Sequence, residues 1–255
     1  MSSSISTAAE LSANARHAAG SCWRVVEAQH HVSTLKLTDT RAEQALLEDL
    51  IEGTKPPIPP ECEHLSFLLY TPFRYYPPLP YGSRFRRAGA LEGVFYGSES
   101  VETAIAESAF WRLLFYAESP ATPWPANAGE HTAFACEFAT GRSIDLTRPP
   151  FDDREKSWMH HNDFGACHAV ADLARGEGID VIKYKSVRDP LHRNNIAILS
   201  CRAFSRASES GRQTWRIHLS QSGVRALCEM PKQTIDFGQA TFSADPRLSK
   251  MKWVR

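Results

Sequence analysis

Residues suited to binding an anion gather in one short stretch of the chain. Arg74 follows a Pro-Phe pair, and three more arginines lie in the segment Gly-Ser-Arg-Phe-Arg-Arg at residues 82–87. The guanidinium of arginine is a planar fork of N–H donors that matches a phosphate or a carboxylate. These residues therefore indicate an anion-binding site, although a solvated edge of the fold would have the same composition.

A phenol and a carboxylate follow shortly after the arginines. Glu107 lies in a predicted helix over about residues 101–116, and its neighbours three and four positions away are mostly apolar. A carboxylate on an apolar face is unfavourable unless it is paired or used in chemistry. Glu107 is therefore either a functional group or one half of a structural ion pair with a nearby arginine. Tyr96 ends an apolar run and is either a second site residue or a core tyrosine.

The stretch from His160 to His168 contains three histidines, an aspartate and Cys167. Its spacing matches no usual zinc pattern, and adjacent side chains on a helix point apart. Nothing in the sequence indicates that the Cys167 thiol is activated. The chain also lacks the GxSxG, P-loop and GxGxxG motifs. We therefore expect neither a metal ion nor a nucleophilic cysteine.

The composition excludes several classes of protein. The chain has 255 residues, of which 42% are hydrophobic and 23% charged, as in ordinary globular proteins. Its 29 basic and 29 acidic residues balance, so we expect no direct binding to nucleic acid through bulk charge. No apolar stretch is long enough for a membrane span or a signal peptide. The six cysteines form no CxxC pair, so we expect a reduced, cytoplasmic protein without a disulfide framework.

The residues around these candidates predict a mixture of helices and strands. A capping box at Thr40 and Glu43 starts the first predicted helix, and Ser100 can cap the second. Helices are predicted over 40–53, 101–116 and 164–175, strands over 23–26, 91–96, 133–138, 143–146, 179–184, 196–200 and 215–219, and proline-rich loops over 55–60, 71–80 and 120–125. Because helices and strands mix without regular alternation, the fold class is α+β, with a mixed sheet and flanking helices.

Several short segments share their order and spacing with a known family. Segments 73–75, 82–85, 93–96 and 100–107, together with the eleven-residue step from Tyr96 to Glu107, resemble the RES domain, which is named for an arginine, a glutamate and a serine. The similarity continues at segments 163–170, 183–190 and 195–200, and the region 23–55 resembles the N-terminal extension of a longer subgroup.

The resemblance suggests how the chain divides. It covers roughly residues 20–225. We therefore expect a flexible tail over 1–20 and a single RES domain over 21–225, with an N-terminal helical extension over 21–65. A C-terminal segment over 226–255 carries no readable site.

The resemblance implies an ADP-ribosyltransferase-like fold that binds NAD and breaks its nicotinamide–ribose bond. Glu107 would then hydrogen-bond the ribose hydroxyls and stabilise developing positive charge. Arg74 and Arg84 would clamp the pyrophosphate, with Tyr75 beside them, and Tyr96 would stack on the nicotinamide or ribose. NAD is the substrate in this interpretation, so no cofactor is expected.

One position departs from the family. The family serine falls where this chain has Gly165, which has no hydroxyl group. Ser186 or Ser200 could take over that role, and the sequence does not choose between them.

The function implied by the resemblance is that of a toxin. It would degrade NAD by hydrolysis or phosphorolysis and arrest growth unless an Xre-type helix-turn-helix antitoxin neutralises it, in a homo- or hetero-oligomer. Two alternatives remain. The chain could transfer ADP-ribose to a protein target, or it could be a non-enzymatic module that binds a nucleotide or RNA phosphate.

Overall fold

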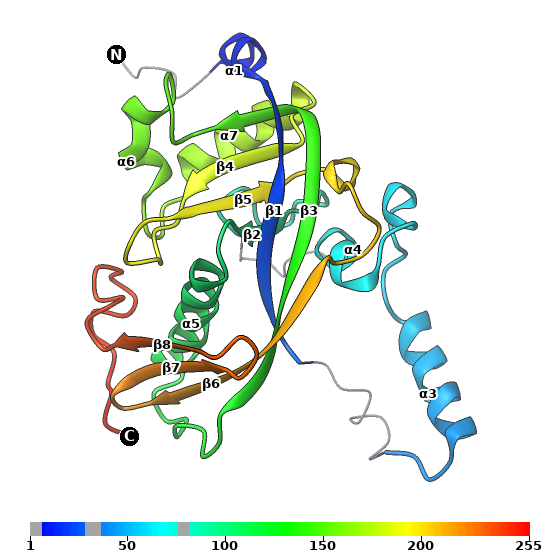
Figure 1. Ribbon diagram of the computed structural model, residues 1–255, viewed down its shortest axis with the longest axis vertical. Coiled ribbons are helices and arrows are strands. Elements are labelled where there is room, and N and C mark those ends of the chain that lie inside the picture. Colours follow the sequence, from blue (N-terminus) through cyan, green and yellow to red (C-terminus); the bar gives the residue numbers. More distant parts are fainter. Residues whose placement is uncertain (1–6, 29–36, 76–81) are drawn as a thin grey trace.

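The described strands form one eight-stranded mixed sheet, and its long strands β1 and β3 run side by side through the centre of the molecule (Figure 1). The computed structural model describes residues 7–28, 37–75 and 82–255. Its strands are β1 (Arg16–Glu27), β2 (Phe95–Ser98), β3 (Gly129–Asp145), β4 (Val181–Lys185), β5 (Asn194–Ile198), β6 (Gly211–Ser220), β7 (Gly223–Cys228) and β8 (Gln233–Gly238). The predicted α+β fold with a mixed sheet and flanking helices is confirmed.

Strand β3 organises the sheet because it has three partners. It pairs antiparallel with β6 through its first half, antiparallel with β1 along most of its length and parallel with β4 at its end. Since β1 also pairs with β2, strands β1, β2, β5, β4 and β3 close into a ring, from which β6, β7 and β8 extend as an antiparallel sheet. The sequence predicted two short strands, over 133–138 and 143–146. Because the pairing with β1 continues through Ala139 and Thr140, these residues form the single strand β3.

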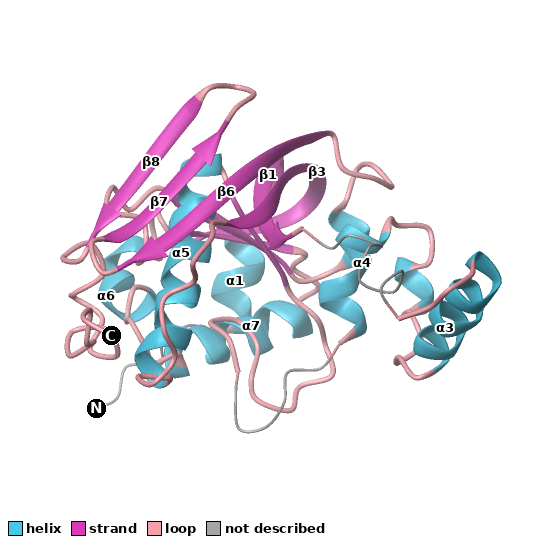
Figure 2. Ribbon diagram, turned by 90° about the horizontal axis from the view of Figure 1, so that it is seen from below, coloured by secondary structure: helices cyan, strands magenta, loops and turns pink. Residues whose placement is uncertain are grey.

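The helices pack mainly against one side of the sheet (Figure 2). They are α1 (Ala8–Asn14), α3 (Arg41–Gly53), α4 (Phe67–Arg74), α5 (Val101–Glu118), α6 (Glu155–Trp158) and α7 (Gly165–Gly176), with 3-10 turns η1 (Pro60–Cys62), η2 (Asp152–Arg154) and η3 (Cys201–Ala203). Ser100 caps α5 as predicted, because its side chain accepts a hydrogen bond from the backbone N–H of Thr103 at 3.2 Å. No helix among the described residues is long and apolar enough to span a membrane.

Three apolar clusters hold these elements together. The first joins α5 to β6, β7 and β8 through Phe110, Leu113 and Trp215, which are fully buried. The second joins α1 and α7 to β4, and the third joins α4 to β2 and β5. Helix α5 is therefore fixed along its length, which gives any side chain on it a rigid support.

Helix α3 stands apart from this core (Figure 1). Thr40 and Glu43 form the predicted capping box. Yet α3, all of whose residues lie in the described ranges, buries none of its side chains, and Leu46 and Leu50 are 61% and 62% exposed. Its local signals are therefore sufficient to define a helix that the core does not cover.

The structure corrects several further expectations about local elements. Residues 8–20 are not a flexible tail, because they form α1 and the first part of β1, and Leu11 is fully buried. The expected strand over 91–96 starts only at Phe95. The loop predicted over 71–80 begins inside α4, while residues 76–80 lie outside the described residues. A disulfide joins Cys62 to Cys201, where we expected none.

The C-terminal segment is part of the fold. The boundary predicted after residue 225 falls inside β7, and β8 follows. Beyond β8, Phe242 and Leu248 are buried against the cluster around α5. The ring of Trp253 stacks on that of Trp124 at 6.0 Å, and the guanidinium of Arg255 donates to carbonyls at the end of α5. The chain thus returns to α5 and packs against it.

Candidate active site

A cavity of about 240 Å³ lies where α5 meets β2, β5 and the loops around β4. Its lining combines two arginines from loops, a carboxylate from α5 and several aromatic rings. The residues are Trp23, Arg24, Val25, Ser83, Arg84, Tyr96, Gly97, Ser98, Ala104, Glu107, Ser108, Trp111, Phe164, Tyr184, Val187, Arg188 and Asn195. Charged groups and apolar walls thus meet in one hollow, the usual character of a small-molecule site.

Glu107 is half-buried on α5 and faces this cavity, as the sequence predicted. Its Oε1 atom accepts two hydrogen bonds of 2.6 Å, one from the hydroxyl of Ser186 and one from the side-chain amide of Asn195. The Asn195 amide is itself oriented, because its oxygen accepts a 2.6 Å hydrogen bond from Ser98. Among the described residues, no hydrogen-bond donor contacts Oε2 of Glu107. The carboxylate is thus fixed through one oxygen and presents the other.

Ser186 is fully buried in the turn that follows β4. Its Oγ atom accepts hydrogen bonds from the backbone N–H groups of Arg188 at 3.1 Å and Asp189 at 3.0 Å. With its acceptor side occupied in this way, the hydroxyl hydrogen is directed at Glu107. The turn therefore determines the orientation of the serine.

Arg84 enters the cavity from the loop before β2 and is 8% exposed. Its guanidinium donates to the backbone carbonyls of Trp158 and His160, the latter at 3.0 Å, and lies 4.9 Å from the ring centre of Phe164. No carboxylate within the described ranges forms an ion pair with it. Its positive charge is therefore positioned but not neutralised, which suits an anionic ligand.

Tyr96 lines the cavity with its ring, but its hydroxyl group has a structural task. That hydroxyl accepts a 2.9 Å hydrogen bond from the backbone N–H of Phe85 and shares one of 2.8 Å with the Ser83 side chain. Burial raises the pKa of Tyr96 above its usual value, so the phenol is neutral at physiological pH. Tyr96 thus fixes the loop that carries Arg84.

Three predicted site residues lie elsewhere. Arg74 ends α4, where it forms an ion pair with Glu52 of α3 at 2.6 Å. Tyr75 is 38% exposed, and Ser200 caps η3 by accepting from the backbone N–H of Arg202. Of the residues that the structure describes, those lining the cavity do not include any of these three. The charge of Arg74 is balanced by Glu52 outside the cavity, which argues against the predicted contact with the pyrophosphate.

The two candidate serines, Ser186 and Ser200, differ in their distance from Glu107. Ser186 contacts Glu107, whereas Ser200 does not reach it. Gly165 is exposed at the start of α7, where its backbone N–H donates to Asp163 at 2.9 Å. Ser186 is therefore the candidate serine that reaches Glu107, although Ser186 itself does not line the cavity.

Most residues that line the cavity, Asn195 and Arg188 among them, were not predicted from the sequence. Asn195 and Arg188 were inside segments noted for their resemblance, but neither was singled out. Arg188 is 4% exposed, and burial lowers its pKa to about 10, against the opposing effect of the nearby carboxylates of Glu107 and Asp245. It therefore remains protonated at neutral pH, with its aliphatic stem and guanidinium inside the protein.

The histidine-rich stretch serves the site indirectly. His160 accepts from the backbone N–H of Asp163 at 2.8 Å, and a ring nitrogen of His168 lies 2.8 Å from the Ser83 carbonyl. Burial raises the pKa of the Cys167 thiol, which disfavours a thiolate nucleophile. No group of three metal-ligating side chains occurs in the part of the chain described. His160 and His168 therefore stabilise the loops around Arg84.

Comparison with known proteins identifies the family of this chain. The profile of the RES domain matches residues 58–220. A similar solved structure is a chain of the M. tuberculosis MbcT–MbcA toxin–antitoxin complex, with 11% sequence identity and a TM-score of 0.45, over 95% of this chain and 98% of that one. A comparison with curated proteins gave no match. Because the profile match spans more than half of the sequence, this chain belongs to the RES domain family.

Proposed function

We propose that this protein binds NAD and cleaves the bond between nicotinamide and ribose. The observation that carries the proposal is the state of Glu107. Oε1 accepts hydrogen bonds from both neighbouring donors, Ser186 and Asn195, whereas Oε2 accepts none from the described residues, and the side chain lines the cavity. A carboxylate held in this way is pre-oriented to accept hydrogen bonds from the hydroxyls of a bound sugar.

The chemistry needs little more than such a carboxylate. When the C1′–N bond breaks, its electron pair leaves with the nicotinamide nitrogen, and the pyridinium becomes a neutral leaving group. The ribose passes through an oxocarbenium-like state, whose positive charge the Glu107 carboxylate stabilises. Water or phosphate then forms the new C1′–O bond and releases its proton. No strong general acid is required for the departure of nicotinamide.

Arg84 supports the dinucleotide part of the proposal. Its guanidinium is held by backbone carbonyls rather than by a carboxylate, so it can pair with the pyrophosphate. The cavity, at about 240 Å³, is smaller than the ~300–1,000 Å³ of pockets that enclose whole ligands. The proposal therefore seats the nicotinamide ribose inside and leaves the adenosine end outside.

The biological role follows from the family. We infer a toxin that arrests growth by draining NAD and that a cognate Xre-type antitoxin neutralises. Membership of the RES domain family supports this role. The antitoxin would act by covering the cavity that holds Glu107, since an exposed NAD-cleaving site must be blocked during growth.

The test is NAD consumption by the purified protein, with and without inorganic phosphate, followed by NMR. The matched control is Glu107→Gln, which keeps the size of the side chain but removes its charge. We expect NAD to disappear with the wild-type protein and to persist, at a rate at least about 100-fold lower, with Glu107→Gln.

The products identify the acceptor. Free ADP-ribose indicates hydrolysis, and a phosphorylated product that forms only with phosphate indicates phosphorolysis. Persistence of NAD with the wild-type protein under both conditions would contradict the proposal. Labelling of a protein by ADP-ribose, with NAD falling only in proportion to that target, would instead favour transfer to protein.

A further inference from the structure

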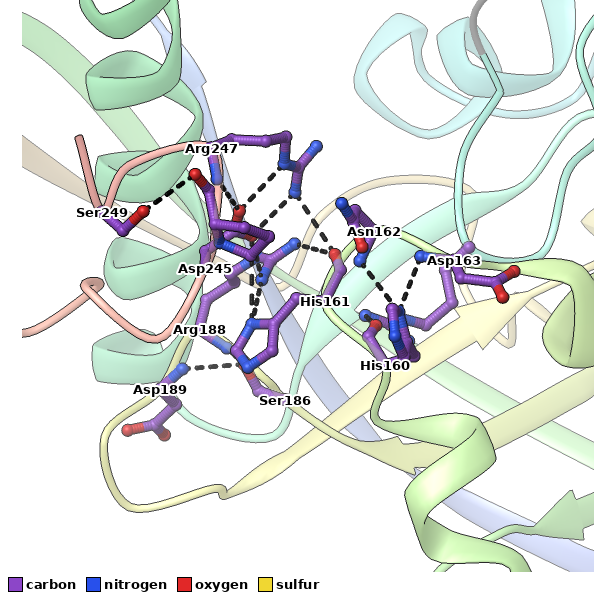
Figure 3. A network of polar contacts seen from close by, with 12 residues as sticks. His160, His161, Asn162, Asp163, Ser186, Arg188, Asp189, Asp245, Arg247 and Ser249 are labelled. Carbon is purple, nitrogen blue, oxygen red and sulfur yellow. Dashed lines mark hydrogen bonds and ion pairs between the residues drawn. The ribbon is translucent and has the colours of Figure 1, made fainter. Parts of the chain in front are cut away.

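The turn that orients Ser186 is anchored on both sides, and Figure 3 shows the side that is held through Arg188. Residue 189 holds it to α5, since the Asp189 carboxylate accepts from the hydroxyl of Thr103 at 2.6 Å. The side chain of Arg188 extends from the same turn in another direction, with its guanidinium carbon 3.8 Å from the ring centre of Phe110. Because the backbone N–H groups of residues 188 and 189 bind Ser186 Oγ, whatever holds these two side chains also holds the serine.

The far end of Arg188 is held by a residue beyond the matched domain. Its Nη1 atom lies 2.9 Å from Oδ2 of Asp245, and its Nη2 atom donates to the carbonyl of His161 at 2.7 Å. The side chains of Arg188 and Asp245 are 3% and 2% exposed. Figure 3 shows Asp245 reaching this cluster from the C-terminal segment. The RES domain match ends at residue 220, so Asp245 comes from outside it.

The carboxylate of Asp245 is itself firmly placed. Arg247 donates to it from its backbone N–H at 3.0 Å and from its side chain at 3.0 and 2.9 Å. Burial alone would raise the pKa of Asp245, but the hydrogen bonds from Arg247 and the charge of Arg188 lower it below its usual value. Asp245 is therefore ionised at neutral pH and gives Arg188 a permanent counter-charge.

We propose that Asp245 is a positioning residue, which holds the Glu107 carboxylate in place through Arg188 and the Ser186 turn. The C-terminal segment thus supports the site through Arg188 without lining the cavity itself. Loss of the Asp245 charge leaves a buried guanidinium without its carboxylate, and such a cation must move toward water. Movement of Arg188 pulls on the backbone N–H that binds Ser186 Oγ, and the hydroxyl then loses its alignment with Glu107.

The first experiment measures this positioning without any substrate. Hydrogen exchange is followed by mass spectrometry on peptides that contain residues 187–189, in the wild-type protein and in Asp245→Asn. The control is Asp236→Asn, which breaks a 2.7 Å ion pair with Arg225 that is exposed on both sides, in the same C-terminal segment. We expect exchange at 187–189 to speed up about tenfold or more in Asp245→Asn and to stay unchanged in Asp236→Asn.

The second experiment measures the consequence for catalysis and rests on the proposed function. Because Glu107 would act on the transition state, Asp245→Asn should lower kcat for NAD cleavage by about 10- to 100-fold while KM changes less than about twofold. A variant that merely lost overall stability would not separate the two constants in this way. Asp236→Asn should match the wild-type protein in both.

The outcomes are distinguishable. If the wild-type protein leaves NAD intact, the proposed function fails, while the exchange comparison still decides whether Asp245 holds the turn. Equal exchange in all three proteins would overturn the positioning role. Faster exchange in Asp245→Asn with an unchanged kcat would overturn its link to catalysis. Should Asp245→Asn not fold, Arg188→Lys takes its place, since it keeps the charge but lacks the fork that spans Asp245 and His161.

Discussion

The hydroxyl of Ser186 lies 2.6 Å from a carboxylate oxygen of Glu107, although 79 positions separate the two residues. The contact joins the turn after β4 to helix α5 at the wall of the cavity. Ser186 receives its orientation from two backbone N–H groups, and Glu107 receives its orientation from Ser186 and Asn195. The carboxylate is thereby fixed before any ligand arrives, which is the condition for electrostatic catalysis.

Removal of the serine hydroxyl should therefore impair the reaction more than binding. We expect Ser186→Ala to lower kcat for NAD cleavage by about 10- to 100-fold, because Glu107 loses a charge-assisted hydrogen bond. Ser200→Ala is the matched control, as Ser200 only caps η3. Steady-state kinetics on both variants decides the matter. A larger loss in Ser200→Ala than in Ser186→Ala would reverse the assignment of the serine.

Substitutions of the two candidate arginines should change different properties, namely substrate binding for Arg84 and thermal stability for Arg74. Arg84→Gln should raise KM for NAD about tenfold or more, because a charge-assisted contact to the pyrophosphate is lost. Arg74→Gln should leave KM unchanged but lower Tm, because it breaks the ion pair with Glu52 at a side chain only 6% exposed. Kinetics and thermal melting on both variants test this. A raised KM in Arg74→Gln would show that Arg74 reaches the substrate after all.

Loss of the Tyr96 hydroxyl should destabilise the loop that carries Arg84. In Tyr96→Phe the backbone N–H of Phe85 and the Ser83 side chain lose a common partner. We expect the free energy of unfolding to fall by about 1–3 kcal/mol. Urea denaturation measures that change, and KM for NAD should rise with it because Arg84 is less well positioned. An unchanged unfolding midpoint would mean that the hydroxyl does not fix the loop.

At acidic pH, protonation of His161 should weaken its contact with Arg188, the partner of Asp245, and so lower the stability of the protein. Burial, with the neighbouring charge of Arg188, lowers the pKa of His161. Its Nδ1 atom lies 3.0 Å from Arg188 Nη1 and must be unprotonated to accept that hydrogen bond. The unfolded chain therefore binds a proton more readily than the folded one below the unfolded pKa of about 6.5. Stability from this group is present above that pH and is lost as the pH falls through the folded pKa.

The pH prediction has a direct check. Melting temperatures measured between pH 7.5 and pH 5 should fall in the wild-type protein. In His161→Gln, which accepts a hydrogen bond without titrating, the fall should be smaller. Parallel curves for the two proteins would contradict a role for His161 in the acid response.

Local signals in the sequence predicted the elements that support the site. Ser100 defined the start of α5, and the apolar neighbours of Glu107 correctly placed this carboxylate toward the interior. The capping box at Thr40 defined the start of α3. These features depend on residues three or four positions apart, whose contacts are fixed by the geometry of one helix. The order of the short motifs likewise identified the family, which the profile match then confirmed.

Which residues meet at the cavity was decided only by the tertiary structure. Arg74 and Arg84 are equivalent in the sequence, but α3 brings the Glu52 carboxylate to Arg74, while the backbone carbonyls of Trp158 and His160 accept hydrogen bonds from Arg84. Ser186 and Ser200 were equally eligible until the turn after β4 was placed against α5. Asp245 had no sequence signal, because its partner Arg188 lies 57 positions away in the chain. Local signals determined where α3 and α5 begin, and the burial of charges between distant segments determined which residues form the site.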